Sequence, residues 1–227
     1  RHVRLLHQGL SEFPRALFAL ADTLELLDLS GNQLTTLPPD LPRLHRLRIL
    51  FASRNPFTAL PSLLGQMPQL EMVGFKACRI AQLPAASLPP HLRWLILTDN
   101  RLSTLPDTWG RQPRLQKLML SCNRLAQLPA SLAQCGRLEL LRMASNRFTR
   151  LPEVVLHLPQ LAWLAAAGNP FSQKSELLAH ASQALEPISY QNLQLHELLG
   201  EGASGHIYRA AVRATGQPLA LKVFKAS

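Results

Sequence analysis

The sequence lacks the features that mark membrane, secreted and metal-binding proteins. Its longest apolar run, Leu161 to Ala167, is far shorter than the ~20 residues that a helix needs to cross a bilayer. Its three cysteines, at positions 78, 122 and 135, form neither an even disulfide set nor a CxxC metal pair. Because 47% of the 227 residues are hydrophobic, a folded core is expected. These features predict a cytoplasmic protein without a membrane partner.

Acidic and aromatic residues are also scarce. Only 14 Asp and Glu stand against 24 Lys and Arg, which gives a net charge of +10. Such an excess suits an acidic protein, a nucleic acid or an anionic membrane, so the placement of the basic residues has to decide. Aromatic residues, which would stack on bases, make up 6% of the chain. We therefore expect no nucleic-acid partner.

The chain contains a repeat of about 23 residues. One column of the repeat is mostly asparagine, with spacings of 23, 23, 22, 23, 23 and 23 residues: Asn32, Asn55, Cys78, Asn100, Asn123, Asn146 and Asn169. Around this column each unit follows the pattern LxxLxLxxNxLxxLPxxLxxLxx. A fixed period of this kind is the signature of a solenoid.

From Val3 to about Phe171 the sequence resembles the leucine-rich repeat family, in its 23-residue Leu-Pro variety. The resemblance implies an α/β solenoid with a parallel sheet on the concave face and short or irregular segments on the convex face. The Leu-x-Leu alternation agrees, because it turns alternate side chains inward and lets stacked units pair their strands. Each Asn is expected to bond turn backbone of neighbouring coils, and Cys78 to be a small buried substitute without a function.

The two ends of the repeat array depart from the pattern. The first unit is degenerate and fills the pattern positions with Val3, Leu5, Gln8 and Leu10. After the last unit, the apolar spacing at Leu177, Leu178 and Leu185 predicts a helix that closes the core, as terminal caps do. We expect a solenoid over residues 1–172, a cap and linker over 173–189, and a different domain over 190–227.

The outward positions of the strands are unusually apolar and form the candidate partner-binding surface. These candidates are Leu26, Ile49, Phe51, Met72, Trp94, Ile96, Met119, Leu140 and Trp163. Because neighbouring strands lie about 4.8 Å apart, the side chains are predicted to form one continuous exposed stripe. The stripe indicates a protein partner, with docking of another part of the same protein as the alternative.

Basic residues flank this stripe in two columns. One column follows the asparagines and contains Arg79, Arg101, Arg124 and Arg147; the other precedes the first Leu of the units and contains Arg46, His91, Arg114 and Arg137. A solvated polar surface is the plain interpretation. The sharper hypothesis is an amphipathic partner whose apolar side meets the stripe and whose acidic residues meet Arg101 and Arg124.

The composition changes after Pro187, where alternating residues predict three strands. The strands are expected at Leu195 to Leu199, Ile207 to Ala211 and Leu219 to Phe224. A glycine-rich sequence, GEGASG, separates the first two strands, and Lys222 lies 17 residues after its last glycine. Because these glycines lie between strands and do not open a helix, a dinucleotide-binding fold is disfavoured.

Residues 190–227 resemble the start of a protein kinase amino-terminal lobe, with GEGASGHIY as its glycine-rich loop and LALK as its lysine motif. The resemblance implies an ATP site in which backbone at Gly200, Gly202 and Gly205 approaches the phosphates. Ile207 and Ala220 would enclose the adenine, and Lys222 would hold the α and β phosphates. The chain ends before the HRD and DFG motifs, so ATP with Mg²⁺ is expected only in a longer protein, and no catalytic or metal residue is assigned here.

The sequence therefore predicts the recognition module and first kinase strands of a longer intracellular protein kinase that acts on Ser, Thr or Tyr. Its solenoid would select a partner or restrain the kinase domain by docking it on the concave face. The alternative is a scaffold whose kinase-like tail binds nucleotide without transferring phosphate. A ubiquitin ligase would need a catalytic cysteine in a separate helical domain, and none of the three cysteines is placed for that.

Overall fold

The computed structural model describes residues 1–182, 188–202 and 205–224. It divides into two compact units, Arg1–Leu178 and Ala179–Ser227. The division falls inside the stretch 173–189 that the sequence assigns to the cap and linker. In the described ranges, no helix combines the length and apolar character needed to cross a membrane.

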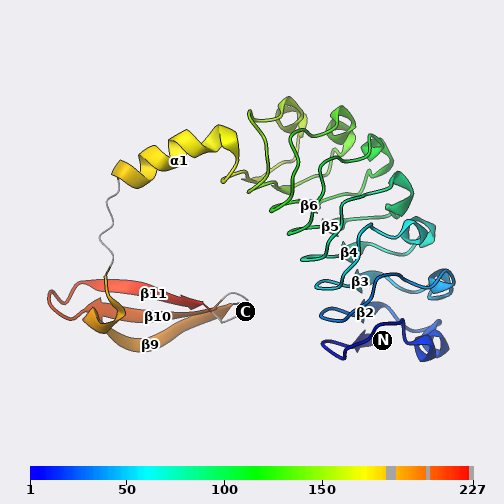
Figure 1. The fold of residues 1–227 in the computed structure, drawn as a ribbon, viewed down its shortest axis with the longest axis horizontal. Helices are drawn as coiled ribbons and strands as arrows, with labels where there is room; N and C mark the ends of the chain where they lie inside the picture. The colour runs from blue at the N-terminus through cyan, green and yellow to red at the C-terminus, as the bar shows by residue number, and fades with distance from the viewer. Residues whose placement is uncertain (183–187, 203–204, 225–227) are drawn as a thin grey trace. The chain divides into compact units, whose positions relative to one another are not determined.

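The first unit is a curved stack of coils, each of which adds a three-residue strand to one parallel sheet (Figure 1). The eight strands are β1 (His2–Arg4), β2 (Leu26–Asp28), β3 (Ile49–Phe51), β4 (Met72–Gly74), β5 (Trp94–Ile96), β6 (Lys117–Met119), β7 (Leu140–Arg142) and β8 (Trp163–Ala165). They pair in sequence order and in the predicted register, with Val3 opposite Leu27 and Leu141 opposite Leu164. The predicted solenoid is confirmed, including its degenerate first coil.

Short 3-10 helices form the convex side of the coils. They are η1 (Arg15–Leu20), η2 (Leu41–Arg43), η3 (Ser62–Gln66), η4 (Ala85–Ser87), η5 (Trp109–Arg111), η6 (Ala130–Gln134) and η7 (Glu153–His157). A proline directly precedes several of them, such as Pro61 before η3 and Pro129 before η6. Because proline has a fixed φ and no N–H, it ends the extended segment and lets the turn begin.

A column of leucines fills the interior between the sheet and the 3-10 helices. The inward residue of each central strand, such as Leu50 and Leu118, has no exposed surface. Phe57 and Phe75 replace leucines in two adjacent coils and pack edge to face, with ring centroids 5.0 Å apart. The coils therefore share one continuous core.

The asparagine column joins consecutive coils at the turn that follows each strand. Asn123 Nδ2 donates to the carbonyl oxygens of Leu97 at 2.9 Å and Leu120 at 3.0 Å, and its Oδ1 accepts the Leu102 N–H at 3.0 Å. The same pattern recurs at Asn55, Asn100, Asn146 and Asn169. The predicted structural role of this column is confirmed.

Cys78 interrupts the column. Its Sγ lies 3.6 Å from the Ala52 carbonyl oxygen and 3.7 Å from that of Lys76, and the side chain is half-buried. A thiol is a weak donor and has no amide oxygen, so it reproduces only part of the asparagine bonding.

The residue before each position of the asparagine column adopts a left-handed backbone conformation, with φ between 53° and 74°. This column consists of His7, Gly31, Arg54, Ala77, Asp99, Cys122, Ser145 and Gly168. Left-handed backbone is costly for residues other than glycine, yet six of the eight are not glycine. The turn geometry therefore overrides local preference, and the sequence pattern did not reveal it.

The helix α1 (Pro170–Ser182) follows the last asparagine. The predicted helix is confirmed, but the prediction that its leucines close the core is wrong, because the Leu177 and Leu178 side chains are 62% and 61% exposed. Phe171, at the start of the helix, packs against the core, and Glu176 Oε1 accepts a hydrogen bond from the Gly168 N–H at 2.9 Å. Leu185 lies outside the described residues.

The second unit contains η8 (Tyr190–Asn192) and an antiparallel sheet in the order β11-β10-β9. Its strands are β9 (Leu193–Gly202), β10 (Gly205–Val212) and β11 (Pro218–Phe224), each longer than the sequence indicated. The turn between β10 and β11 is closed by the Val212 N–H, which donates to the Gln217 carbonyl at 3.0 Å. The three predicted strands are confirmed.

Candidate functional site

The outward positions of the parallel strands form two rows across the concave face. In the first row the Cα partners follow the order Leu26, Ile49, Met72, Trp94, Lys117, Leu140, Trp163. In the second row they follow the order Asp28, Phe51, Gly74, Ile96, Met119, Arg142, Ala165. The predicted neighbours therefore lie side by side, and we call the apolar members of both rows the concave stripe.

The concave stripe is less exposed than the sequence suggested. Leu26 is only 9% exposed and Trp163 is 60% exposed, whereas the members between them are half-buried. The close strand spacing explains this difference, since each side chain covers part of the next. A methyl group added at Gly74, for example, would stand 2.6 Å from the Phe51 ring, and the Lys117 ammonium lies 3.8 Å from the centre of the Trp94 ring.

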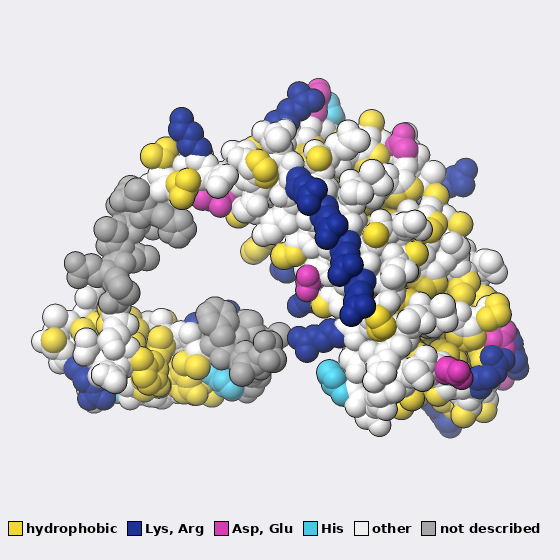
Figure 2. All heavy atoms as spheres, viewed as in Figure 1, with side chains coloured by type: hydrophobic (Ala, Val, Ile, Leu, Met, Phe, Trp, Pro, Cys, Tyr) yellow, Lys and Arg dark blue, Asp and Glu magenta, His cyan; other side chains and the backbone are white. Residues whose placement is uncertain are grey.

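Four arginines follow the asparagine column at equivalent positions of successive coils. We call Arg79, Arg101, Arg124 and Arg147 the arginine ladder. Each backbone N–H donates to a carbonyl of the preceding coil, as Arg101 does to Ile80 and Arg124 to Leu102, both at 2.8 Å. All four side chains are exposed. Figure 2 shows a row of Lys and Arg side chains that runs along the stack of coils.

Charges at the opposite ends of the strands are arranged differently. Arg48 Nη2 lies 3.0 Å from Glu71 Oε2, and Arg93 Nη1 lies 3.5 Å from the same oxygen. The hydrogen bond from Arg48 is the largest cause of a lowered pKa of the Glu71 carboxyl. We call Arg48, Glu71 and Arg93 the paired column. No such ion pair involves the arginine ladder in the described part of the chain.

The second predicted basic column also lies at this opposite edge. Arg46, Arg114 and Arg137 are exposed, and His91 is half-buried. Gln69 interrupts the column between Arg46 and His91, so its charge is less continuous than that of the arginine ladder.

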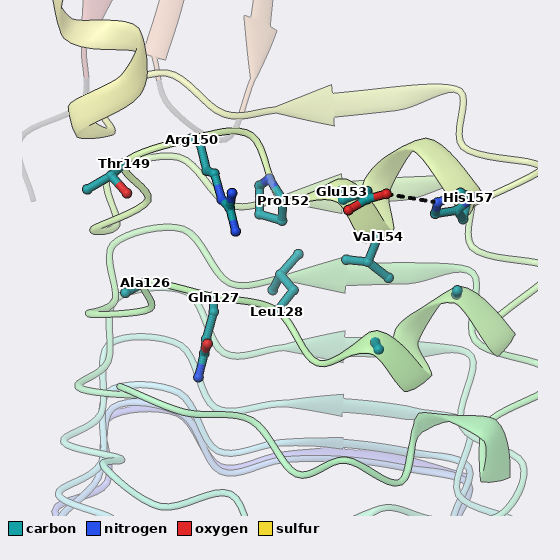
Figure 3. Close-up of a pocket in the computed structure, with 11 residues that line it drawn as sticks. Ala126, Gln127, Leu128, Thr149, Arg150, Pro152, Glu153, Val154 and His157 are labelled. Carbon is teal, nitrogen blue, oxygen red and sulfur yellow. Dashed lines mark ion pairs between the residues drawn. The ribbon is translucent and has the colours of Figure 1, made fainter.

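A surface hollow of about 500 Å³ lies between the sixth and seventh coils (Figure 3). Gln127 and Leu128 line it from one coil, and Arg150 and Val154 from the next. Its walls come from the segments that lead to η6 and η7, together with those helices, so it lies apart from the strand positions that form the concave stripe. None of the candidate residues from the sequence lines this hollow.

The three cysteines are free thiols. Burial raises the pKa of Cys135 to about 12 and also raises that of Cys78, so neither side chain forms a reactive thiolate near neutral pH. Within the described ranges, no group of three or more His, Cys, Asp or Glu could hold a metal ion.

The candidate nucleotide residues of the second unit lie on adjacent strands. Ile207 of β10 is the Cα partner of Gly200 on β9 and of Lys222 on β11, and Arg209 is the partner of Ala220. Directly opposed residues share a face of an antiparallel sheet, and so do residues two apart on one strand. Ile207, Ala220 and Lys222 therefore share one face.

The glycine-rich sequence joins β9 to β10. Gly202 and Gly205 are Cα partners at the end of this pair of strands, and Gly205 has a φ of 155°. Positions 203 and 204, between these glycines, lie outside the described residues.

Comparison with known proteins agrees with the repeat geometry. The family model described as Leucine rich repeat matches residues 90–148 and 113–171, and a second leucine-rich repeat model matches residues 23–44. Together with the coiled parallel sheet, these matches show that residues 23–44 and 90–171 consist of leucine-rich repeats. Such solenoids present extended concave binding surfaces.

Two human proteins are among the relatives. PH domain leucine-rich repeat-containing protein phosphatase 1 is 30% identical over 103 residues, which are 44% of this chain and 6% of that protein. Leucine-rich repeat-containing protein 58 is 39% identical over 94 residues, which are 38% of this chain and 25% of that protein. The match thus spans a small part of the phosphatase.

Solved structures match the solenoid more extensively. A leucine-rich repeat protein of Leptospira interrogans superposes with a TM-score of 0.59 at 27% identity, over 73% of this chain and 48% of that chain. A TDR receptor gives a TM-score of 0.60 at 28% identity, over 70% of this chain and 28% of that chain. An internalin from Listeria monocytogenes, at 22% identity and a TM-score of 0.58, covers 69% of this chain and 45% of that chain and shares the fold.

Proposed function

We propose that the solenoid is a recognition module that binds a protein partner across its concave face. The observation that carries this proposal is the register of apolar outward residues on neighbouring strands, from Ile49 to Trp94 in the first row and from Phe51 to Met119 in the second, in coils that also carry exposed arginines. A half-buried apolar surface of this kind offers contact area, and the flanking charge offers orientation. The free thiols fit an intracellular setting, where cysteines stay reduced.

Peptide display against the whole chain tests this proposal. Peptides that bind the wild type should lose at least about ten-fold in affinity with Ile96→Lys, because the substitution places a charge in the centre of the concave stripe. Leu156→Lys is the matched control, since Leu156 lies on η7 of the convex side and is 73% exposed. Equal affinity for the wild type and both variants would place the binding surface elsewhere.

We further propose that residues 190–227 begin a protein kinase domain of a longer intracellular protein. The shared face of Ile207, Ala220 and Lys222, beside the glycine-rich connection, supports this proposal because adenine and phosphates would contact such a face. In that protein the solenoid would select a substrate or restrain the kinase domain, and ATP would bind with Mg²⁺. The alternative is a scaffold whose tail binds nucleotide without phosphate transfer.

Transfer of phosphate from labelled ATP by the full-length natural protein separates these two functions. Lys222→Met should abolish transfer if the domain is an active kinase, since the lysine would hold the α and β phosphates. A higher rate after deletion of residues 1–172 would identify the solenoid as a restraint. ATP binding that depends on Lys222, without transfer to any substrate in Mg²⁺ or Mn²⁺, would favour the scaffold.

A further inference from the structure

The side chains of the arginine ladder make no ion pair within the described residues. The structural bonds at its positions come from the backbone, since each N–H donates to the preceding coil while the side chain is exposed. The same column holds Gln33 and Pro56 in earlier coils, so the turn accepts uncharged residues there. The adjoining left-handed column supplies one basic and one acidic neighbour, Arg54 and Asp99, which leave the charge of the ladder uncancelled.

The paired column shows how this fold arranges charges that serve its own stability. There Glu71 stands between Arg48 and Arg93, so the inter-coil neighbours have opposite signs. In the ladder all four neighbours have the same sign, at a coil spacing of about 4.8 Å. Like charges at this distance repel each other, and none of the four has an ion-pair partner in the described ranges. The fold therefore leaves this charge available to another molecule.

We propose that the arginine ladder binds an extended acidic segment of a partner protein that runs along the axis of the stack. This inference rests on the recognition function proposed above and specifies the chemistry of the partner. Each guanidinium can take a carboxylate in a two-pronged hydrogen-bonded pair. The ladder spans about 14 Å, which corresponds to four or five residues of extended chain. Apolar side chains of the same partner would contact the adjacent concave stripe.

A protein segment fits this surface better than RNA or a bilayer. Bases need exposed aromatic rings for stacking, and in the second row of the stripe the coils that carry Arg101 and Arg124 present Ile96 and Met119, which are not aromatic. The basic residues stand in a single file along a curved stack, whereas a flat anionic bilayer attracts basic residues spread over a plane. An acidic chain can follow the file and present apolar side chains to the concave stripe at the same time.

Fluorescence anisotropy of the whole chain with a synthetic peptide tests the proposal. The probe is a labelled peptide of about ten residues in which Glu alternates with Leu, and its partner probe replaces every Glu by Gln. We expect the Glu peptide to bind at least about ten-fold more tightly than the Gln peptide in about 50 mM salt. Its affinity should fall several-fold in about 300 mM salt, because exposed charges are screened.

A matched pair of charge reversals localises the effect. Arg101→Glu with Arg124→Glu should weaken binding of the Glu peptide by at least about ten-fold. Arg114→Glu with Arg137→Glu makes the same change of charge at the opposite edge, on residues that are also exposed, and should weaken it by less than about two-fold. Equal losses in both double variants would reduce the effect to net charge and overturn the proposal.

The remaining outcomes separate this inference from the recognition function itself. Equal affinity for the Glu and Gln peptides, both lost in Ile96→Lys, would overturn the acidic segment and leave the concave stripe as a binding surface. Tighter binding of an oligouridine RNA, or of vesicles that contain phosphatidylserine, would assign the ladder to a different class of partner. Failure of the Glu peptide to bind at about 1 mM, where even weak contacts register, would also overturn the proposal.

Discussion

The asparagine column and the arginine ladder are adjacent in the same turn, but in the described part of the chain only the asparagine side chains bond within the fold. Asn123 points into the stack, is 8% exposed and bonds two coils, whereas Arg124, the next residue, is exposed and bonds only through its backbone. Both columns recur with the period of the repeat, the asparagines in six coils and the arginines in four consecutive coils. Regular recurrence alone therefore does not separate a structural residue from a binding residue. The two are distinguished by whether the polar atoms of the side chain hydrogen-bond within the fold or face solvent.

The largest effect on stability is expected from a substitution in the asparagine column. Asn123→Ala should lower the free energy of unfolding by at least about 3 kcal/mol, because it leaves the Leu97 and Leu120 carbonyls and the Leu102 N–H without their partner. Urea unfolding followed by tryptophan fluorescence measures this change, since all three tryptophans lie in the first unit. A loss below about 1 kcal/mol would contradict the structural role of the column.

At Cys78 the role of the asparagine column can be tested by introducing an asparagine instead of removing one. Asparagines elsewhere in the column accept an N–H of the preceding coil, and the corresponding donor for position 78 is the Phe57 N–H. Cys78→Asn should therefore raise the free energy of unfolding by about 1 kcal/mol, the usual value of a hydrogen bond gained in a half-buried turn. Cys78→Ala is the control, and an Asn variant no more stable than the Ala variant would show that the turn at this coil has adapted to the thiol.

Glu71 shows that an outward column can also serve the fold. Its folded-state pKa lies below the ordinary value of 4.5, chiefly because Arg48 hydrogen bonds to the carboxylate. Such a group stabilises the fold above pH 4.5, and the contribution is lost as pH falls through the lowered pKa.

Glu71→Gln should consequently cost about 0.5 kcal/mol near pH 7 and less at a strongly acidic pH, because the contribution of the carboxylate is lost as pH falls through its lowered pKa. Urea unfolding at both values measures the difference. A cost that stays the same across this range would mean that packing, and not charge, explains the effect of the substitution.

The sequence predicted the parts of the solenoid that depend on periodicity. The leucine and asparagine columns follow from the repeat, because each coil must bury the same face and satisfy the same turn. The column of residues with left-handed backbone conformation did not follow from the repeat. It contains residues as different as Arg54, Ala77 and Asp99, which have only their backbone conformation in common.

The sequence predicted which residues form the concave stripe, but it did not predict how exposed their side chains are. The order of residues along the concave stripe followed from strand register, but the cover that Phe51 gives Gly74 and Lys117 gives Trp94 depends on side-chain directions that a pattern does not contain. The exposed Leu177 and Leu178 have the same cause, since apolar spacing predicts a helix without specifying what lies against it. The sequence also did not show that, among the described residues, the arginine ladder lacks ion pairs while Arg48, Glu71 and Arg93 at the opposite edge form them.

The smallest expected effect on stability completes the comparison between the two columns. Arg101→Gln with Arg124→Gln should change the free energy of unfolding by no more than about 0.5 kcal/mol, because exposed side chains without partners contribute little to folding. The sign should be slightly stabilising at low salt and vanish at high salt, since the substitutions relieve repulsion between neighbouring coils. Urea unfolding at both salt concentrations measures this. A clear loss of stability would mean that the guanidinium groups support the turn, and the ladder would then belong with the asparagines and not with a partner.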